Sequence, residues 1–347
     1  MALSAQVFAW SHAKSDVPAV LAAACGMGLA VLAGVALGHP AWGLAAAIGG
    51  MLASHAGTGG SLGAHLRLLA PLLAASGLAA LVAGLAAGHG VWTELAVVAA
   101  GGLAALAGGY SRPLGLGAGR FIIFLPILLG AAESHPAVLD TLLLALGGAV
   151  LTMGLALLFG ALARALGWHP PPPPEPGRLA TRAQLFRRWR QTLGTWAGWQ
   201  YPLRLMACLA AAGALHLAWP EHHLRWVTLT VAILAQRTIE MPPLKTLQRA
   251  LGAMLGVAAA GLLVFHPAPP GWDIAALIAL FGGLAPWLRG RNYLAFTACT
   301  TPLIMVMFSA GGPIEPGLLA DRLVATLMGA GLVLAADMLA SRPLGAN

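Results

Sequence analysis

The chain has 347 residues, of which 59% are apolar and 9% are charged, and its mean hydropathy is +0.81. A water-soluble domain could not bury this much apolar surface, so the composition excludes a soluble globular protein and predicts a membrane protein. The formal net charge of +8 does not indicate nucleic-acid binding, because the basic residues lie in the connections between apolar runs rather than on one water-facing surface.

Apolar runs of about 20 residues recur along the chain, which is the length that a helix needs to cross a hydrocarbon core of roughly 30 Å. Barrel strands would alternate in polarity, and these runs do not. The first half contains runs at about 17–38, 40–55, 65–88, 91–109, 117–132 and 137–161. The second half contains runs at about 203–219, 225–237, 243–265, 271–288, 292–309 and 317–340. The sequence therefore predicts an all-α membrane protein with about twelve transmembrane helices.

The two halves of the chain resemble each other at corresponding positions. Trp42 and Trp226 open the second segment of their halves, and Pro126 and Pro302 lie within the fifth. Asp140 and Asp321 open the sixth segment, and each is followed eight residues later by a glycine, Gly148 or Gly329. Because six is an even number, both copies would enter the membrane from the same side. We therefore predict two parallel six-helix repeats, at 1–165 and 201–347, with a linker at 166–200 and a transport pathway where the halves meet.

The linker begins with a run of prolines at 170–174 and 176, which favours an extended spacer. Apolar residues then recur at helical spacing, with arginines between them: Leu185, Phe186, Trp189, Leu193 and Trp196. This pattern predicts a basic amphipathic helix on the inner leaflet, with a solvated charge run as the alternative.

The distribution of Lys and Arg predicts the orientation, because these residues favour the cytoplasmic side in short loops. With the amino terminus inside, all 19 of them except Arg225 and Arg322 fall on the cytoplasmic side. We therefore expect a multi-pass protein of the inner membrane with both termini in the cytoplasm.

No sequence motif for an enzyme or a metal site is evident. Lys14 and Lys245 are the only lysines, and neither follows a glycine-rich loop, so a Walker-type nucleotide site is excluded. HExxH, CxxC and GxSxG motifs are absent, and apart from the adjacent His222 and His223 the histidines are scattered. We expect no catalytic residues, no cofactor and no bound metal.

Prolines and hydroxyl groups indicate where a pathway would lie. A proline within a membrane helix frees a backbone carbonyl, and interruptions at matching positions of two repeats point to a site near the midplane. The candidate pathway residues in these segments are Pro126, Thr228, Thr230, Thr297, Thr300, Thr301 and Pro302. The alternative is that each threonine bonds to its own helix backbone.

Basic residues at the cytoplasmic ends of segments suggest that the cargo is an anion. The basic residues that could attract a carboxylate are Arg67, Arg120, Arg237, Lys245, Arg249 and Arg291, of which Arg67, Arg120, Arg249 and Arg291 are the candidate pathway residues. The alternative for each is that it anchors the topology and never contacts substrate.

One family resemblance rests on residues of the second half. The stretch Arg-Trp-Val-Thr-Leu-Thr-Val at 225–231 precedes an Arg-x-x-Gly-x-x-x-Gly helix formed by Arg249, Gly252 and Gly256. Together with the sequence at 321–329, it resembles the fusaric acid resistance (FUSC) family of membrane transporters, best over about 200–340 and more loosely over 17–165. Gly252 and Gly256 form a small-xxx-small pair that lets helices approach closely.

The resemblance implies efflux of aromatic or other small carboxylic acids, with the aluminium-activated malate transporters as distant relatives. The leading hypothesis is therefore an exporter of small carboxylate anions, and not an enzyme. The alternatives are a gated anion channel and a non-transporting membrane enzyme or scaffold. The expected partners are membrane lipids, a small anionic substrate and a periplasmic adaptor protein, and not nucleic acid.

Overall fold

The structure, a computed structural model, describes residues 7–12, 16–54, 62–134, 138–168, 181–235, 242–264, 271–308 and 316–341. Over these residues it consists of α-helices and connections, without a strand, which confirms the prediction of an all-α chain. The helices up to the linker are α2 (Val17–Ala36), α3 (Pro40–Ala53), α4 (Leu62–Ala86), α5 (Val91–Ala107), α6 (Arg112–Ser134) and α7 (Val138–Ala165). Those that follow are α8 (Arg182–Leu193), α9 (Trp196–Ala218), α10 (Arg225–Leu234), α11 (Pro242–Val264), α12 (Gly271–Arg289), α13 (Tyr293–Phe308) and α14 (Pro316–Ser341).

The helices account for a multi-pass membrane protein. Within the described residues, six stretches are long and apolar enough to cross a bilayer: Val17–Ala36, Arg112–Gly130, Leu142–Ala165, Trp196–Ala218, Gly271–Arg289 and Gly317–Ala340. Five further apolar stretches of 10–17 residues are shorter: Pro40–Ala53, Ala70–Ala86, Val91–Ala107, Arg225–Leu234 and Tyr293–Met307. Each apolar run that the sequence singled out thus coincides with a helix.

Local signals explain where two of these helices begin. The Asp16 side chain accepts a hydrogen bond from the Ala19 backbone N–H at 3.2 Å and caps the start of α2. At α8, Thr181 and Gln184 each accept the other's backbone N–H, which is a capping box. The linker helix expected from hydrophobic spacing is therefore present as α8, with its first turn fixed by its own side chains.

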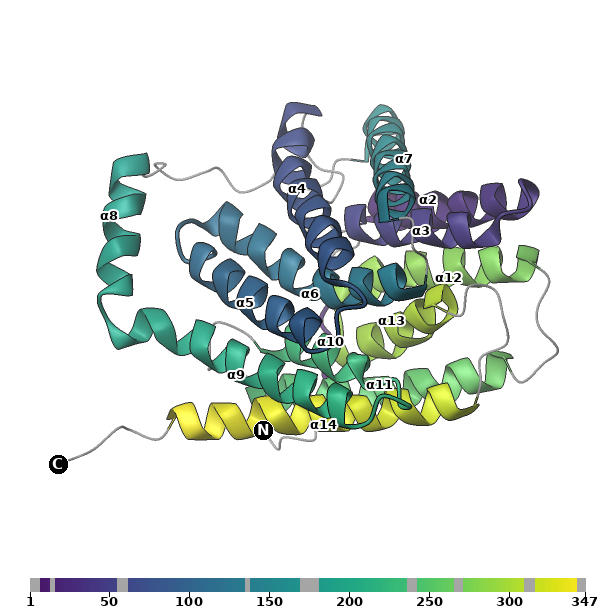
Figure 1. The fold of residues 1–347 in the computed structure, drawn as a ribbon. Coiled ribbons are helices and arrows are strands. Elements are labelled where there is room, and N and C mark those ends of the chain that lie inside the picture. Colours follow the sequence, from purple (N-terminus) through teal and green to yellow (C-terminus); the bar gives the residue numbers. More distant parts are fainter. Residues whose placement is uncertain are drawn as a thin grey trace. The chain divides into compact units, whose positions relative to one another are not determined.

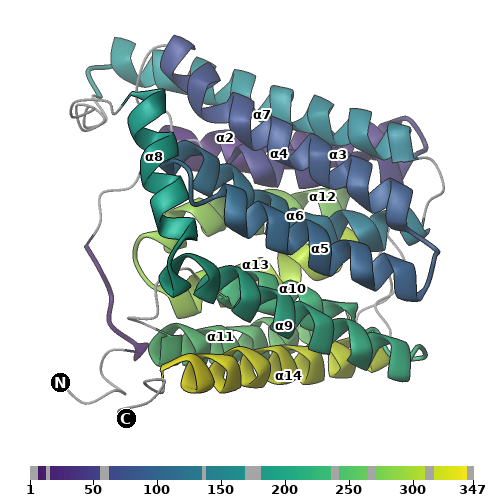
Figure 2. The ribbon, with the colours of Figure 1, turned by 60° about the vertical axis from the view of Figure 1, so that its left-hand side comes forward.

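The chain forms two compact units, and each draws on both halves of the sequence. The first unit comprises Met1–Leu73, Leu139–Pro174 and Leu247–Leu319. In it α2 packs on α3 and α12, and α13 packs on α3 and α12 (Figure 1). The second unit comprises Ala74–Val138, Glu175–Thr246 and Ala320–Asn347. In it α9 packs on α10, α5 and α8, and α6 packs on α5 and α10 (Figure 2).

These packing pairs match between the units when the segments of each half are numbered one to six. In the first unit, segments one and two of the first half (α2, α3) contact segments four and five of the second half (α12, α13). In the second unit, segments one and two of the second half (α9, α10) contact segments four and five of the first half (α5, α6). Exchanging the two halves therefore converts one set of contacts into the other.

The match extends to single residues. Double glycines at corresponding places in α5 and α12 allow close approach of a side chain on the first segment of the other half, in the pairs Gly101 with Leu209, Gly102 with Met206, Gly282 with Met27 and Gly283 with Ala24. The residues that meet the glycines have the same spacing, since Leu209 follows Met206 by three positions and Met27 follows Ala24 by three positions. The matched glycines of the sixth segments make corresponding contacts, Gly148 with the backbone of Ala46 and Gly329 with Thr230. Ala46 and Thr230 each lie four positions after the matched tryptophan of their half, Trp42 or Trp226.

Candidate functional site

Two glycines that the sequence singled out, Gly252 and Gly256, bring α11 close to α13 in the first unit. A Cβ atom built on Gly252 would lie 2.6 Å from the Leu294 carbonyl oxygen and 2.7 Å from Thr297 Cβ. A Cβ on Gly256 would lie 2.7 Å from Thr301 Cβ. Contacts rise along both helices in the same order, so α11 and α13 run parallel. The start of α13 lies beside the turn of α11 that holds Arg249 and Gly252, about two turns after α11 begins.

Arg249 lies one turn before Gly252, and its burial sets it apart from an exposed topology anchor. Only 2% of the surface of Arg249 is exposed. Its guanidinium lies beside the side chain of Tyr293, which stands one turn before Thr297 on α13. Its Nε has no hydrogen-bond partner within the described part of the chain, and no described carboxylate forms an ion pair with it.

Thr297 provides a second polar atom on the same helix interface. The residue is fully buried, and its Oγ1 has no hydrogen-bond partner among the described residues. Thr300 and Thr301 behave differently, because both hydroxyls donate to the Thr297 carbonyl, at 3.3 and 2.9 Å. The backbone-bonding alternative therefore describes Thr300 and Thr301, whereas Thr297 keeps a free hydroxyl beside α11.

Pro302 frees a backbone carbonyl at this interface without breaking the helix. Proline has no N–H, so the carbonyl four residues earlier, that of Ala298, loses its helical donor. That oxygen faces α11, since a Cβ on Gly256 would lie 2.8 Å from it. Helix α13 nevertheless continues from Tyr293 to Phe308, and α6 likewise continues through Pro126. A matched proline thus changes one hydrogen bond rather than dividing its segment in two.

The amino-terminal end of α13 adds to the positive potential around Arg249. Asn292 caps α13 by accepting the Ala295 backbone N–H at 2.9 Å. The first backbone N–H groups of a helix and its macrodipole both favour an anion at that end. A buried arginine, a capped helix end and a free hydroxyl therefore share one interface, and an arginine so buried is costly unless a negative charge compensates it.

The other sequence-predicted residues are not gathered at this interface. Thr228 and Thr230 lie buried on α10, and Arg120 and Pro126 lie on α6, both in the second unit. Arg291 stands at the end of α12 with its guanidinium 4.3 Å from the centre of the Trp287 ring. The position of Arg67 is on α4, but its side chain lies outside the described residues.

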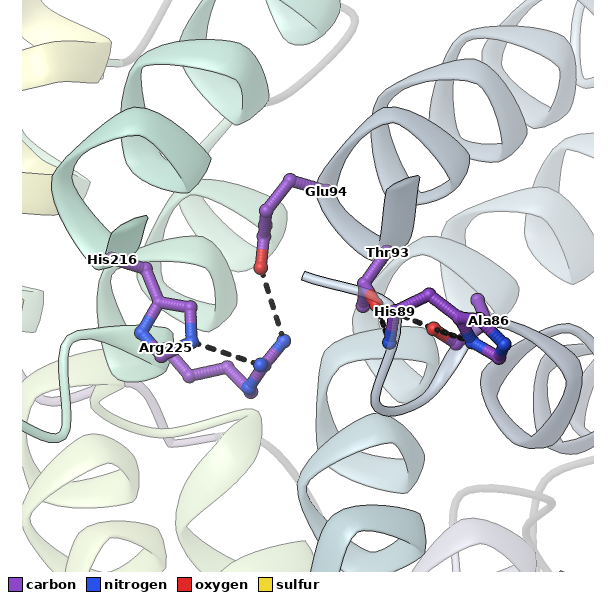
Figure 3. Close-up of polar contacts among 6 residues, drawn as sticks. All are labelled: Ala86, His89, Thr93, Glu94, His216 and Arg225. Carbon is purple, nitrogen blue, oxygen red and sulfur yellow. Dashed lines mark hydrogen bonds and ion pairs between the residues drawn. The ribbon is translucent and has the colours of Figure 1, made fainter. Parts of the chain in front are cut away.

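A second polar cluster, partly buried in the second unit, was not anticipated from the sequence. Figure 3 shows Arg225 of α10 reaching toward Glu94 of α5 and His216 of α9. Its Nη1 donates to Glu94 Oε1 at 3.3 Å, and its Nη2 lies 2.9 Å from His216 Nε2. Because arginine can only donate, His216 must accept at Nε2 and carry its proton on Nδ1. The sequence placed Arg225 away from the cytoplasmic side and gave no other signal for this contact.

Other buried charges in the second unit have identified partners. Arg204 donates to Asp337, and the fully buried Arg322 lies 4.2 Å from the centre of the Trp226 ring. Asp321 accepts from the His223 backbone N–H and contacts the rings of His222 and His223, at 2.9–3.0 Å. Over the described residues, no group of three or more His, Cys, Asp or Glu side chains could hold a metal ion.

Comparison with known proteins identifies one related family. Residues 206–336 match the family described as fusaric acid resistance protein-like, which confirms the predicted resemblance for that part of the chain. The matched segment contains α10 to α13 and therefore the whole α11–α13 interface. No curated protein and no solved structure matches the chain. The likeness to aluminium-activated malate transporters stays a prediction.

Proposed function

Because residues 206–336 match the fusaric acid resistance protein-like family, we propose that this multi-pass membrane protein is a transporter of the efflux or resistance kind. Its cargo is a small carboxylate anion, aromatic acids included, and it exports that cargo across the inner membrane. The family match supports the transporter class, and the chemistry of the α11–α13 interface supports the sign of the cargo.

Arg249 is the observation that carries this proposal. It is buried inside an apolar protein, it lies in the family-matched segment, and no described carboxylate neutralises it. The guanidinium fork suits a carboxylate, which can accept two parallel hydrogen bonds from it. Thr297 Oγ1 and the amino-terminal end of α13 supply further donors on the same side. An anion passing this point would satisfy groups that the described protein leaves unsatisfied.

We further infer that the chain is a duplicated six-helix unit with twelve membrane helices. The matched packing pairs and the matched glycine contacts support this inference, because unrelated helices would not repeat the same partners at the same spacing. In this arrangement each unit combines segments one, two and six of one half with segments four, five and much of segment three of the other. The shorter helices would then tilt or thin the bilayer locally.

Transport by purified protein in proteoliposomes tests the function. We expect saturable efflux of radiolabelled benzoate, and Arg249→Lys should weaken the apparent affinity because a lysine cannot form the bidentate contact. Loss of a charge-assisted hydrogen bond costs about 1.5–3 kcal/mol, which is roughly ten- to hundredfold in affinity. Arg187→Lys on the exposed surface of α8 is the matched control.

Two outcomes would contradict the proposal. Absence of efflux for benzoate and for aliphatic carboxylates, in liposomes that hold folded protein, would argue against an anion transporter. Equal affinity of Arg249→Lys and Arg187→Lys at matched protein levels would remove Arg249 from the pathway and leave it as a structural arginine.

A further inference from the structure

A segment near the amino terminus, residues 7–12, contacts both helices of the candidate site, α11 at Gln248 and α13 at its capping residue Asn292. Three hydrogen bonds join this segment, here named the strap, to the rest of the first unit. Gln248 Nε2 donates to the Val7 carbonyl at 3.0 Å, and Asn292 Nδ2 donates to the Ala9 carbonyl at 3.0 Å. The Ser11 backbone N–H donates to the Arg291 carbonyl at 2.9 Å.

The two amide side chains that hold the strap are the immediate neighbours of the site residues. Gln248 precedes Arg249 on α11, and Asn292 precedes Tyr293 at the start of α13. Both amides belong to residues that are 7% exposed, and Asn292 is held in place because its Oδ1 caps α13. The strap is therefore fastened to both helices at the level where Arg249 meets Tyr293.

Side-chain contacts of the strap are few and apolar. Val7 is buried, with 2% of its surface exposed, and Trp10 meets the edge of Trp287 with ring centroids 6.0 Å apart. Phe8, between them, is 67% exposed. Within the described residues the strap has no ion pair. A segment held by three neutral hydrogen bonds and two apolar side chains can leave its place without separating charges.

The strap carbonyls occupy donors that a carboxylate could also use. The amide groups of Gln248 and Asn292 point at the oxygens of Val7 and Ala9, and each amide is otherwise a buried donor that needs an acceptor. Each amide belongs to a residue directly before a site residue in the chain, so we infer that a carboxylate at Arg249 can reach them once the strap has left. The strap and such an anion would thus compete for the same two amides.

We propose that the strap is a built-in gate of the Arg249 site, which covers the start of α13 and the adjacent turn of α11 and is displaced when a carboxylate binds. This inference rests on the proposed function, because it names what regulates that site. In the closed state the strap carbonyls accept hydrogen bonds from the amides of Gln248 and Asn292. When the strap leaves, the anion accepts these hydrogen bonds in its place. Binding of cargo and opening of the gate are then one step.

A reversible crosslink tests the gate. Trp10→Cys and Trp287→Cys, in a background with the native Cys25, Cys208 and Cys299 changed to alanine, are joined by a reducible bis-thiol linker. Efflux of radiolabelled benzoate from proteoliposomes should fall to about a tenth or less when the strap is tethered, and reduction should restore it in the same preparation. Each single-cysteine variant treated with the linker is the control for modification alone.

A second variant tests the gate from the opposite direction. Trp10→Ala removes the contact with Trp287, so the strap should leave more readily and benzoate efflux should become about two- to tenfold faster. Phe8→Ala is the matched control, because this exposed ring has little surface to lose and its variant should transport like the wild type.

The outcomes separate the gate from the function on which it rests. If the tethered protein transports as fast as the reduced one, the strap is a fixed structural element and the gate is overturned. Arg249-dependent efflux by the reduced protein would leave the proposed function standing in that case. If neither wild-type nor reduced protein moves any carboxylate, the proposed function fails and the gate fails with it.

Discussion

Gly256→Ala is expected to destabilise the protein, because its new methyl group would be forced into α13. The added Cβ would lie 2.7 Å from Thr301 Cβ and 2.8 Å from the Ala298 carbonyl oxygen. Carbon atoms in optimal contact are about 3.5–4.0 Å apart, so the helices must separate by roughly 1 Å. One of the two obstructing atoms belongs to the backbone and cannot rotate away. Overpacking of this kind costs about 1–3 kcal/mol.

A second glycine separates this clash from the effect of helix propensity. Gly154 lies within α7 of the same unit, and a Cβ there would meet nothing within 4 Å. Alanine stabilises a helix by about 0.5–1 kcal/mol relative to glycine, and both variants receive that gain. Their difference in unfolding free energy therefore isolates the clash, at about 1–3 kcal/mol.

Thermal unfolding in detergent, followed with a thiol-reactive dye, measures this difference. Cys299 is buried on α13, so its exposure reports the helix that the clash would displace. Gly256→Ala should expose it at a lower temperature than the wild type, and Gly154→Ala at the same or a higher one. If Gly256→Ala unfolds at or above the temperature of Gly154→Ala, the close approach of α11 and α13 is wrong.

The remaining predictions concern charges and glycines of the second unit, and unfolding in detergent measures each. Glu94→Gln should destabilise the protein by about 1–3 kcal/mol, because the partly buried Arg225 would lose its carboxylate partner; an unchanged unfolding temperature would contradict this. Arg204→Met should be destabilising alone and recover when combined with Asp337→Leu, since an apolar pair replaces a buried ion pair; equal losses in the single and double variants would refute that reading. Gly329→Ala should also be destabilising, and a smaller side chain facing it on α10 should restore the loss.

Hydropathy was sufficient to place the helices but not their ends. The apolar runs predicted a start for α9 near residue 203, and the helix begins at Trp196. The additional turns contain Gln200 and Tyr201, which lower the hydropathy of the window while remaining helical. Hydropathy measures suitability for lipid, whereas a helix continues wherever its backbone hydrogen bonds do. The amphipathic α8 was predictable for the complementary reason, since its apolar residues recur at helical spacing.

The candidate site was predicted only where its residues are close in sequence. Arg249, Gly252 and Gly256 form one motif on one helix, so the spacing alone places them on a common face. Tyr293 was not predicted, because nothing in the sequence shows which turn of α13 meets Arg249. The strap and the Glu94–Arg225 contact were missed for the same reason. Contacts between residues separated by a hundred or more positions depend on which helices pair, and short-range patterns do not encode that choice.

Gly329 and Gly148 occupy matched positions, yet they should respond differently to second-site changes. A Cβ on Gly329 would lie 2.7 Å from Thr230 Cβ, which is a side-chain atom, whereas a Cβ on Gly148 would meet the backbone of Ala46. Thr230→Gly should therefore relieve much of the loss in Gly329→Ala, with a coupling energy of about 0.5–3 kcal/mol in a double-mutant cycle. Ala46→Gly should not relieve Gly148→Ala, because removing a methyl group leaves the obstructing backbone in place. Unfolding temperatures of the single and double variants measure both couplings. Equal coupling in the two pairs would show that these matched glycines do not make the contacts on which the duplicated architecture rests.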